Sequence, residues 1–347
     1  MLTLGLVSCL AAVAAAQTSL PRGRKTDLRI SFIDVGQGDA IWIKTPDTGR
    51  GSKNILIDGG PDRGRQNRLV TYLQTYGVLP GAVIDYVVVT HPHDDHYPGL
   101  LDVLAQYQVA TVIDSGFPKA GEYETFLAAA RAEQVNGKPS TVIDLRQATD
   151  VPLDWGKGVT ARITYADSAD ARDMGSHNTR ENNASAVIRL ELGAFSFLFM
   201  GDAEGKSRKQ PPDTAHFVEH VLLSRFPPAE LHATVLKAGH HGSETGSTLP
   251  FLRAVQPKII VVMTGRRSFN GRFLPDEGVI ERYEELDPDV LILRTDDKDE
   301  AEGHTTKDDQ DGDDIYMRTD GRTLRVYQAI GPDRRRRWVK VAELTGG

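Results

Sequence analysis

The sequence has 347 residues, of which 39% are hydrophobic and 26% are charged, so it can bury a large core and has the composition of an ordinary globular protein. Its formal net charge of −7 is misleading, because residues 296–314 hold ten acids and two lysines and the rest of the chain is therefore about +1. Acidity thus does not exclude an anionic substrate. Cys9 is the only cysteine, which excludes an internal disulfide and leaves nitrogen and oxygen as candidate metal ligands.

Residues 1–16 form an apolar, alanine-rich stretch that precedes Gln17. Such a stretch predicts a secretory signal peptide cleaved near Ala16, or a disordered N-terminal segment, within residues 1–27. The segment that ends at Cys9 also resembles a lipoprotein acylation box, but the apolar run continues beyond it, which favours cleavage over acylation. We therefore expect an exported protein, periplasmic or secreted, or a cytoplasmic one if the segment is not a signal. No later segment approaches the roughly 20 apolar residues of a membrane span, so no transmembrane domain is expected.

From residue 28 onward the hydrophobic pattern alternates between strands and helices. Strands are expected at 28–34, 40–44, 54–57, 84–90, 109–114, 141–145, 158–165, 184–192, 195–200, 233–237, 258–263, 290–295, 315–318 and 323–328. Helices are expected at 68–76, 100–106, 122–134, 217–223 and 278–286. This alternation defines one domain over residues 28–330 and permits either a doubly wound sheet or two sheets packed face to face.

Three segments lack such a pattern. Residues 166–183 are polar and aperiodic, which predicts a long loop. Residues 296–314 cannot pack a core and predict a mobile acidic loop within the domain. Residues 331–347 are expected to form a C-terminal tail.

The most informative segment has the pattern H-x-H-x-D-H, from His91 to His96, directly after a buried strand. Imidazole nitrogen and carboxylate oxygen are ligands that zinc and similar ions prefer. Alternate residues of an extended segment point the same way, so His91 and His93 can share one ion. Asp95 and His96 follow as the chain turns toward a helix, and they can reach a second position. The segment therefore predicts a metal site rather than a solvated polar loop.

Four other segments combine with this cluster in a recognisable order, namely Phe32 to Ala40 (F-I-D-V-G-Q-G-D-A), Leu56 to Gly60 (L-I-D-G-G), Phe199 to Asp202 (F-M-G-D) and Leu236 to Ser243 (L-K-A-G-H-H-G-S). Over residues 28–327 the chain resembles the metallo-β-lactamase superfamily. Within it, the chain is similar to the ComEC-like branch, the hydrolase domain of a competence protein and its free-standing relatives. The resemblance implies an α/β fold, the αββα sandwich of two mixed sheets with helices outside.

The resemblance also implies a set of site residues. The expected metal ligands are His91, His93, Asp95, His96, Asp202 as the bridging carboxylate, and His240 in preference to its neighbour His241. Asp95 and Asp202 are expected to orient the nucleophile. Asp58 would accept a hydrogen bond from a ligand imidazole and so fix its tautomer. His241 and Ser243 are expected to contact substrate or to orient their neighbours.

The chain departs from the superfamily pattern at one position. Most dinuclear relatives supply a further histidine between the first cluster and the bridging aspartate, where this sequence has Glu181-Asn182-Asn183. Asn183 or His177 could complete the first site, but an amide oxygen is a poorer zinc ligand than imidazole. We therefore expect one or two zinc ions, with a first site that binds metal more weakly or prefers manganese.

Two metal ions close together can lower the pKa of a bridging water, and the resulting hydroxide attacks carbonyl or phosphorus. The small donors around Gly242-Ser243 suit phosphate oxygens, and the resemblance implies phosphodiester hydrolysis. A metal-dependent phosphodiesterase acting on a small or polymeric phosphodiester, nucleic acid included, is therefore expected. Hydrolysis of a β-lactam, lactone or thioester is the alternative, and so is a non-enzymatic binding or sensor protein with a partial metal site.

Overall fold

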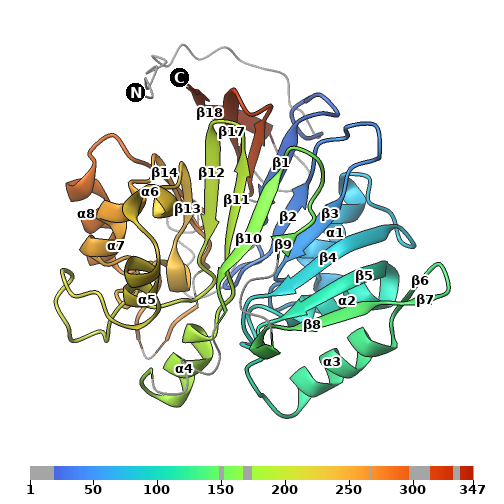
Figure 1. The fold of residues 1–347 in the computed structure, drawn as a ribbon, viewed down its shortest axis with the longest axis horizontal. Helices are drawn as coiled ribbons and strands as arrows, with labels where there is room; N and C mark the ends of the chain where they lie inside the picture. Colours follow the sequence, from blue (N-terminus) through green and yellow to red (C-terminus); the bar gives the residue numbers. More distant parts are fainter. Residues whose placement is uncertain are drawn as a thin grey trace.

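The computed structural model describes residues 19–147, 152–166, 174–265, 267–269, 271–296, 313–330 and 337–346. In these residues two sheets pack face to face, and helices cover the outer face of each sheet (Figure 1). The predicted αββα sandwich is confirmed, and the doubly wound alternative is excluded.

The first sheet, called the large sheet below, has nine strands in the order β18-β17-β16-β1-β2-β3-β4-β5-β8. Their bounds are β1 Leu28–Phe32, β2 Ile41–Lys44, β3 Asn54–Ile57, β4 Val83–Val89, β5 Gln108–Asp114, β8 Thr141–Asp144, β16 Ile315–Thr319, β17 Thr323–Ile330 and β18 Arg337–Thr345. Pairing is parallel from β3 to β8 and antiparallel elsewhere. Helices α1 (Arg68–Thr75), α2 (Pro98–Gln106) and α3 (Glu122–Ala132) cover its outer face, where their apolar stripes form one core with β4 and β5.

The second sheet, the small sheet, has seven strands in the order β15-β14-β13-β12-β11-β10-β9. Their bounds are β9 Pro152–Leu153, β10 Thr160–Tyr165, β11 Val187–Leu192, β12 Phe195–Phe199, β13 Val235–Lys237, β14 Ile259–Val262 and β15 Leu291–Arg294. Strands β12 to β15 are parallel. Helices α5 (Phe217–Arg225), α6 (Pro228–Leu231), α7 (Leu249–Val255) and α8 (Glu277–Leu286) pack against the outer face and form a separate core with it. A short hairpin, β6 (Gln134–Val135) and β7 (Lys138–Pro139), forms a separate two-stranded sheet.

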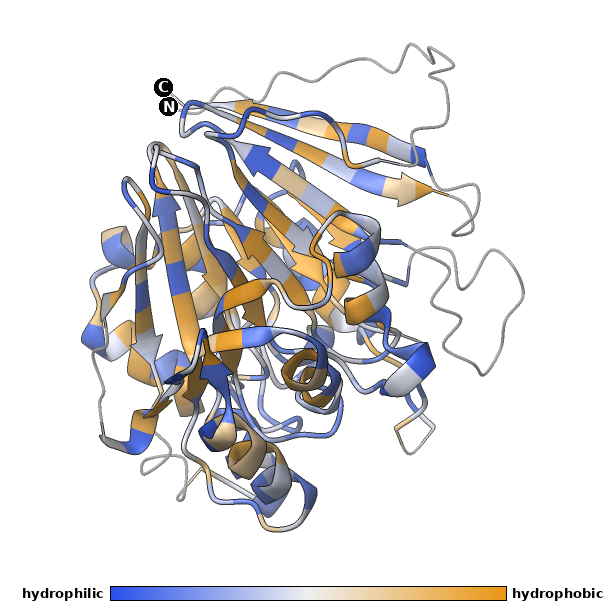
Figure 2. Cartoon of the chain, turned by 90° about the vertical axis from the view of Figure 1, so that its right-hand side faces the viewer, coloured by the Kyte–Doolittle hydropathy of each residue, from blue (hydrophilic) through white to orange (hydrophobic). Residues whose placement is uncertain are grey.

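The central core lies between the two sheets, where alternate residues of each strand face the opposite sheet. Phe32 of the large sheet and Phe199 of the small sheet meet there with ring centroids 6.1 Å apart. Figure 2 shows hydrophobic residues concentrated on the strands of the central layers and hydrophilic residues on the connecting loops. Complete burial of one apolar side chain stabilises the fold by about 1.5–3 kcal/mol. The many buried residues of this core therefore fix the positions of the strand ends from which the polar loops begin.

Two sequence predictions were wrong. Within the expected loop 166–183, residues His177–Asn183 form helix α4, which begins after Ser176, whose side chain accepts a hydrogen bond from the Thr179 amide. This helix buries Glu181, Asn182 and Asn183 in polar contacts rather than an apolar stripe, which explains why no helical period is visible. Residues 167–173 lie outside the described residues.

The expected tail 331–347 is also wrong, because residues 337–345 form β18, paired antiparallel with β17 at the edge of the large sheet. Trp338 and Leu344 are buried, and Trp338 packs against Tyr316. The domain therefore extends past residue 330. The predictions for residues 1–18 and for most of the acidic loop, residues 297–312, fall outside the described residues. Across the part of the chain that is described, no helix combines the length and apolarity that crossing a bilayer requires.

Candidate metal centre

The candidate centre lies where the carboxyl ends of parallel strands from the two sheets come together. Strand β4 ends at Val89 and is followed by the histidine cluster, which leads into α2. Strand β12 of the small sheet ends just before Asp202, and β13 ends at Lys237 just before His240 and His241. Because the carboxyl ends of neighbouring parallel strands share one edge of a sheet, polar residues distant in sequence meet at this point.

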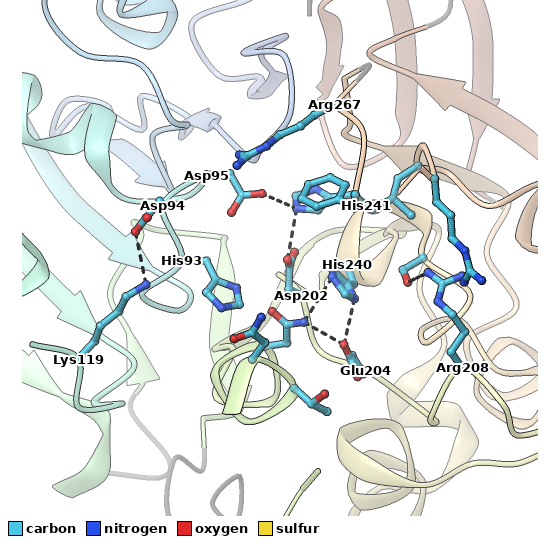
Figure 3. A pocket seen from close by; sticks show the side chains of 17 residues that line it. His93, Asp94, Asp95, Lys119, Asp202, Glu204, Arg208, His240, His241 and Arg267 are labelled. Carbon is cyan, nitrogen blue, oxygen red and sulfur yellow. Dashed lines mark hydrogen bonds and ion pairs between the residues drawn. The ribbon is translucent and has the colours of Figure 1, made fainter. Parts of the chain in front are cut away.

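Imidazole nitrogens and carboxylate oxygens converge on Asp202. Its Oδ1 lies 3.4 Å from His96 Nε2, and its Oδ2 lies 3.2 Å from His241 Nε2 and 3.7 Å from His91 Nε2. Asp95 Oδ2 lies 3.4 Å from the same His241 nitrogen. Figure 3 shows His241 pointing toward Asp95 and Asp202 at the centre of the pocket.

Two groups of side chains therefore offer donor atoms at chelating distances. One contains His91, His93 and Asp202, and the other contains Asp39, His96, Asp202 and His241; in each group one donor atom per residue lies within 4.8 Å of the others. Asp202, predicted as the bridging carboxylate, belongs to both groups, whereas Asp95, also predicted as a ligand, belongs to neither. His93 completes the first group, with its Nδ1 3.0 Å from His91 Nε2.

Hydrogen bonds outside the centre fix the orientation of the rings. His96 Nδ1 lies 2.8 Å from Asp58 Oδ2, and Asp58 also accepts hydrogen bonds from the amide and hydroxyl of Thr90. His241 Nδ1 lies 2.8 Å from the Met263 carbonyl oxygen, which can only accept. Both rings therefore place the proton on Nδ1 and direct the Nε2 lone pair inward.

The inward-facing atoms fit a cation. With both rings neutral, the Nε2 lone pairs of His96 and His241 face each other at 3.3 Å, and a positive charge between them is needed to stabilise the contact. Asp202 Oδ1 is buried without a hydrogen-bond partner. Buried unpaired carboxylate oxygens are costly unless a proton or a metal ion satisfies them. Imidazole and carboxylate together form a donor set typical of a zinc or manganese site.

The electrostatics of the centre also demand positive charge. Burial lowers the pKa of His96, but Asp202, Asp58 and Asp95 outweigh burial and raise that pKa well above its ordinary value. Burial also lowers the pKa of His241, but Asp202 outweighs burial and raises that pKa well above its ordinary value. Burial would raise the pKa of Asp202, yet the neighbouring imidazoles, that of His241 foremost, hold it well below the usual range. Asp202 therefore stays ionised. Its negative charge is balanced either by protonated imidazoles or by metal ions bound to neutral imidazoles.

The centre opens into a cleft of about 690 Å³ with charges of both signs on its wall. The acidic lining residues are Asp94, Asp95, Asp202 and Glu204, and the basic ones are Lys119, Arg208, Arg267 and Arg272. Figure 3 places Lys119 and Arg208 on opposite sides of the centre.

Hydrogen bonds hold two of these cations in place. The Arg208 guanidinium donates to Asp276 Oδ1 at 2.8 Å and to Ser243 Oγ at 3.2 Å. Lys119 Nζ donates to the carbonyl oxygen of Pro92 at 2.7 Å. Ser243, expected from the sequence to contact substrate, therefore lies on the cleft wall and supports Arg208.

His240, which the sequence favours as the ligand, lies outside both donor groups, and His241 lies in one of them. His240 Nδ1 lies 3.0 Å from both Glu204 Oε1 and Thr245 Oγ1, whereas His241 lies among the carboxylates. Both histidines have left-handed backbones, with φ of 48° and 54°. This conformation costs about 1–3 kcal/mol per non-glycine residue and is typical of functional sites. It determines which of two adjacent side chains enters the centre, and no local sequence pattern encodes it.

Neither candidate for the missing histidine joins the donor groups. His177 has a 65% exposed side chain and contacts Glu181, while Asn183 Oδ1 accepts a hydrogen bond from the Glu204 amide. Instead, Glu181 of α4 places its Oε2 2.5 Å from His93 Nε2. Sequence reasoning missed this carboxylate because the helix that carries it has no apolar period.

Asp39 and Lys237 were also missed as site residues. Both lie within segments that carried the resemblance, and both are buried charges beside strand ends. Lys237 follows an apolar run directly, as Asp58 does, whereas Asp39 lies in the glycine-containing turn between β1 and β2. Their importance depends on their pairing across the two sheets, which the sequence does not reveal.

Comparisons with known proteins agree with this geometry. The sequence model described as "Metallo-beta-lactamase superfamily" matches residues 33–266. Among curated proteins the chain is 28% identical to ComE operon protein 3 of Bacillus subtilis (strain 168) over 284 residues, which cover 77% of this chain and 32% of that protein. It is 26% identical to competence protein ComA of Neisseria gonorrhoeae, covering 78% of this chain and 31% of that protein. The chain thus spans about a third of the length of these relatives.

Solved structures show more distant likeness. CmlA beta-hydroxylase, as its E377D mutant, matches with a TM-score of 0.43 and 18% identity over 79% of this chain and 53% of that chain. A diphosphatase from the PhnP family matches with a TM-score of 0.35 and 13% identity over 68% of this chain and 85% of that chain.

Proposed function

Because the chain belongs to the metallo-beta-lactamase superfamily, we propose that it is a metal-dependent phosphodiesterase. The observation that carries the proposal is the sharing of Asp202 between two groups of imidazole and carboxylate donors. Two cation positions that share one carboxylate are the arrangement expected for hydrolysis assisted by two metal ions.

Each residue has a defined task in this proposal. His91, His93 and Asp202 would hold one divalent ion, and His96, His241 and Asp202 the other, with zinc or manganese as the candidates. Such ions supply Lewis acidity and make water a stronger nucleophile near neutral pH. Asp95 and Asp202 keep unprotonated oxygens toward the cleft, so they can accept hydrogen bonds from water and orient it. Asp58 keeps His96 in the tautomer that metal binding requires.

Charge supports an anionic substrate. With neutral imidazoles, the carboxylates of Asp39, Asp58, Asp95, Asp202 and Glu181 and the ammonium of Lys237 give the centre a net charge of −4. Two divalent ions would neutralise this charge. Divalent ions beside basic residues on the cleft wall favour a group with two free oxygens and a negative charge, such as a phosphodiester.

Arginine on the cleft wall favours the same substrate class. Asp276 and Ser243 hold the Arg208 guanidinium at the cleft, where its planar donors suit phosphate oxygens. In a β-lactam, lactone or thioester the reacting carbonyl group itself is uncharged, whereas in a phosphodiester the reacting group carries the negative charge. A small or polymeric phosphodiester, nucleic acid included, is therefore the proposed substrate. Export of the chain stays a prediction from the sequence.

The deciding experiment is turnover of bis-p-nitrophenyl phosphate by protein reconstituted with zinc or manganese. We expect nitrophenol release that a chelator abolishes. The variant His220→Ala, on the exposed surface of α5, should release nitrophenol at the wild-type rate. Turnover of nitrocefin should be slower than turnover of the phosphodiester. Nitrocefin turnover without nitrophenol release would assign the chain to lactam chemistry instead. Inertness to both substrates, together with absence of metal after purification and reconstitution, would make it a binding protein.

A further inference from the structure

We propose that Lys237 is a built-in cation that keeps Asp39 from coordinating metal and so leaves a coordination position open for substrate. The inference rests on the metal centre of the proposed function but not on the identity of the substrate. It concerns a lysine and an aspartate that are both buried beside the two donor groups.

Lys237 ends strand β13, and its side chain is 0% exposed. Its ammonium forms an ion pair with Asp39 Oδ2, donates a hydrogen bond to the Gly201 carbonyl oxygen at 3.0 Å and lies 4.0 Å from Asp202 Oδ1. A fully buried lysine is costly unless it is paired, and these contacts supply the pairing. The ammonium thus lies between two carboxylates, of which only Asp202 is shared by both donor groups.

Asp39 is close enough to become a ligand. One of its oxygens lies within 4.8 Å of donor atoms of His96, Asp202 and His241. The turn that carries it is fixed, because the Asp39 amide donates to the Asp95 carbonyl oxygen at 3.3 Å. Gly38 in this turn has a φ of 138°, and a Cβ there would clash with the same oxygen. Asp39 therefore stays at the centre whether or not Lys237 is present.

The number of donors decides what such a site can do. Structural zinc sites are closed by four protein ligands, whereas catalytic sites keep one position open. His96, His241 and Asp202 offer three protein donors to the second position, and Asp39 is the fourth residue of that donor group. By neutralising the Asp39 carboxylate through Oδ2, the ammonium weakens the remaining oxygen as a metal donor. Lys237 is thus a positioning residue that acts through Asp39.

The test is Lys237→Met, in which the freed Asp39 carboxylate is expected to join the metal site. Metal affinity, measured by competition with a chromophoric chelator, should rise by about tenfold or more, within the range by which neighbours of ligands tune metal sites. Turnover of bis-p-nitrophenyl phosphate should fall by a similar factor because the open position is lost. Adding Asp39→Asn should return both quantities toward wild type, since an amide oxygen is a poor zinc ligand.

Lys206→Met is the matched control. Lys206 is also 0% exposed and is paired with Glu244 at 2.8 Å, but it touches neither donor group. We expect its loss to lower the free energy of unfolding and to leave metal affinity and turnover unchanged. Weaker metal binding by Lys237→Met than by wild type would show that the lysine only supports the fold, and it would overturn the proposal.

A second pair of variants keeps the test decisive if Lys237→Met does not fold. Asp39→Asn alone leaves the buried ammonium uncompensated beside the centre, so metal affinity should fall, and Asp39→Asn with Lys237→Met should recover it. No recovery in the double variant would contradict the proposal. These affinities need no substrate, so a wild-type protein that binds metal but cleaves no phosphodiester would refute the proposed function alone.

Discussion

The large-sheet side of the centre draws its imidazole donors from one short loop, His91 to His96, whereas the small-sheet side draws Asp202 and His241 from two separate loops. On the first side, local backbone geometry brings the ligands together, because they follow one strand and precede one helix. On the second side, only the parallel pairing of β12 with β13 brings the two loops into contact. One side is therefore a motif, and the other is a product of the fold.

This difference has an energetic consequence. Small-sheet donors depend on long-range order and on left-handed backbone at His240 and His241, which costs about 1–3 kcal/mol per residue. Ion pairing between Lys237 and Asp39 connects the two sides and stabilises their relative position. Substitutions of the small-sheet donors should therefore reduce metal binding at the whole centre. Substitutions of residues that only contact the donors, on either side, should reduce metal binding less.

The largest effect is expected for Asp202→Asn, because this residue serves both donor groups. Loss of a partner outside the metal ligands costs about 10–100-fold in affinity or activity, so loss of the shared carboxylate should cost more than a hundredfold in turnover. Elemental analysis should show fewer bound ions per chain than in wild type. Retention of the wild-type metal content with undiminished turnover would contradict the bridging role.

His241→Ala and His240→Ala form the next test, since they separate two adjacent residues of the same loop. His241 Nε2 faces Asp202 and Asp95, so its loss should lower metal affinity by about a hundredfold, comparable to the upper range for perturbed metal sites. His240 contacts Glu204 and Thr245, so its loss should leave metal affinity within a few-fold of wild type. The reverse ranking in a chelator competition assay would restore the assignment predicted from the sequence.

These two tests concern the part of the centre that the sequence described least well. Sequence reasoning identified the cluster from His91 to His96 because ligand spacing, strand and helix are all local. It selected Asp202 and Asp58 from the resemblance, each in a matched segment at the end of an apolar strand. The choice between His240 and His241 depends on φ values that only tertiary packing determines, so the sequence could not settle it.

The fold shows the same division. Strands with a clear apolar pattern were predicted to within a few residues, and the face-to-face arrangement followed from the resemblance rather than from periodicity. Helix α4 was missed because its buried side chains are polar, and β18 was missed because its burial does not alternate along the whole strand. In both elements, contacts with the rest of the fold outweigh local pattern.

Asp58→Asn tests the outer shell of the large-sheet side. Asp58 accepts hydrogen bonds from His96 and from Thr90, and an asparagine amide could donate to His96 Nδ1 and favour the wrong tautomer. We expect metal affinity to fall by about 10–100-fold, less than for Asp202→Asn. Asp85→Asn is a suitable control, since Asp85 accepts a backbone hydrogen bond from Asn54 on β3 and belongs to neither donor group. Equal losses in the two variants would indicate a general effect on the large sheet.

The smallest effect is expected at Ser176, which caps helix α4 beside the small sheet. Its hydroxyl accepts a hydrogen bond from the Thr179 amide at 3.4 Å, and Ser176→Ala should cost about 0.5–2 kcal/mol of helix stability. In Ser176→Ala, amide exchange in α4 should be faster than in wild type. Because Glu181 of α4 contacts His93, metal should also bind slightly more weakly to the group of His91, His93 and Asp202, and only to that group. Ser176→Thr, which keeps the hydroxyl, should stay near wild type. Unchanged exchange in Ser176→Ala would mean that buried polar contacts of Glu181 and Asn182, not the cap, hold α4 against the centre.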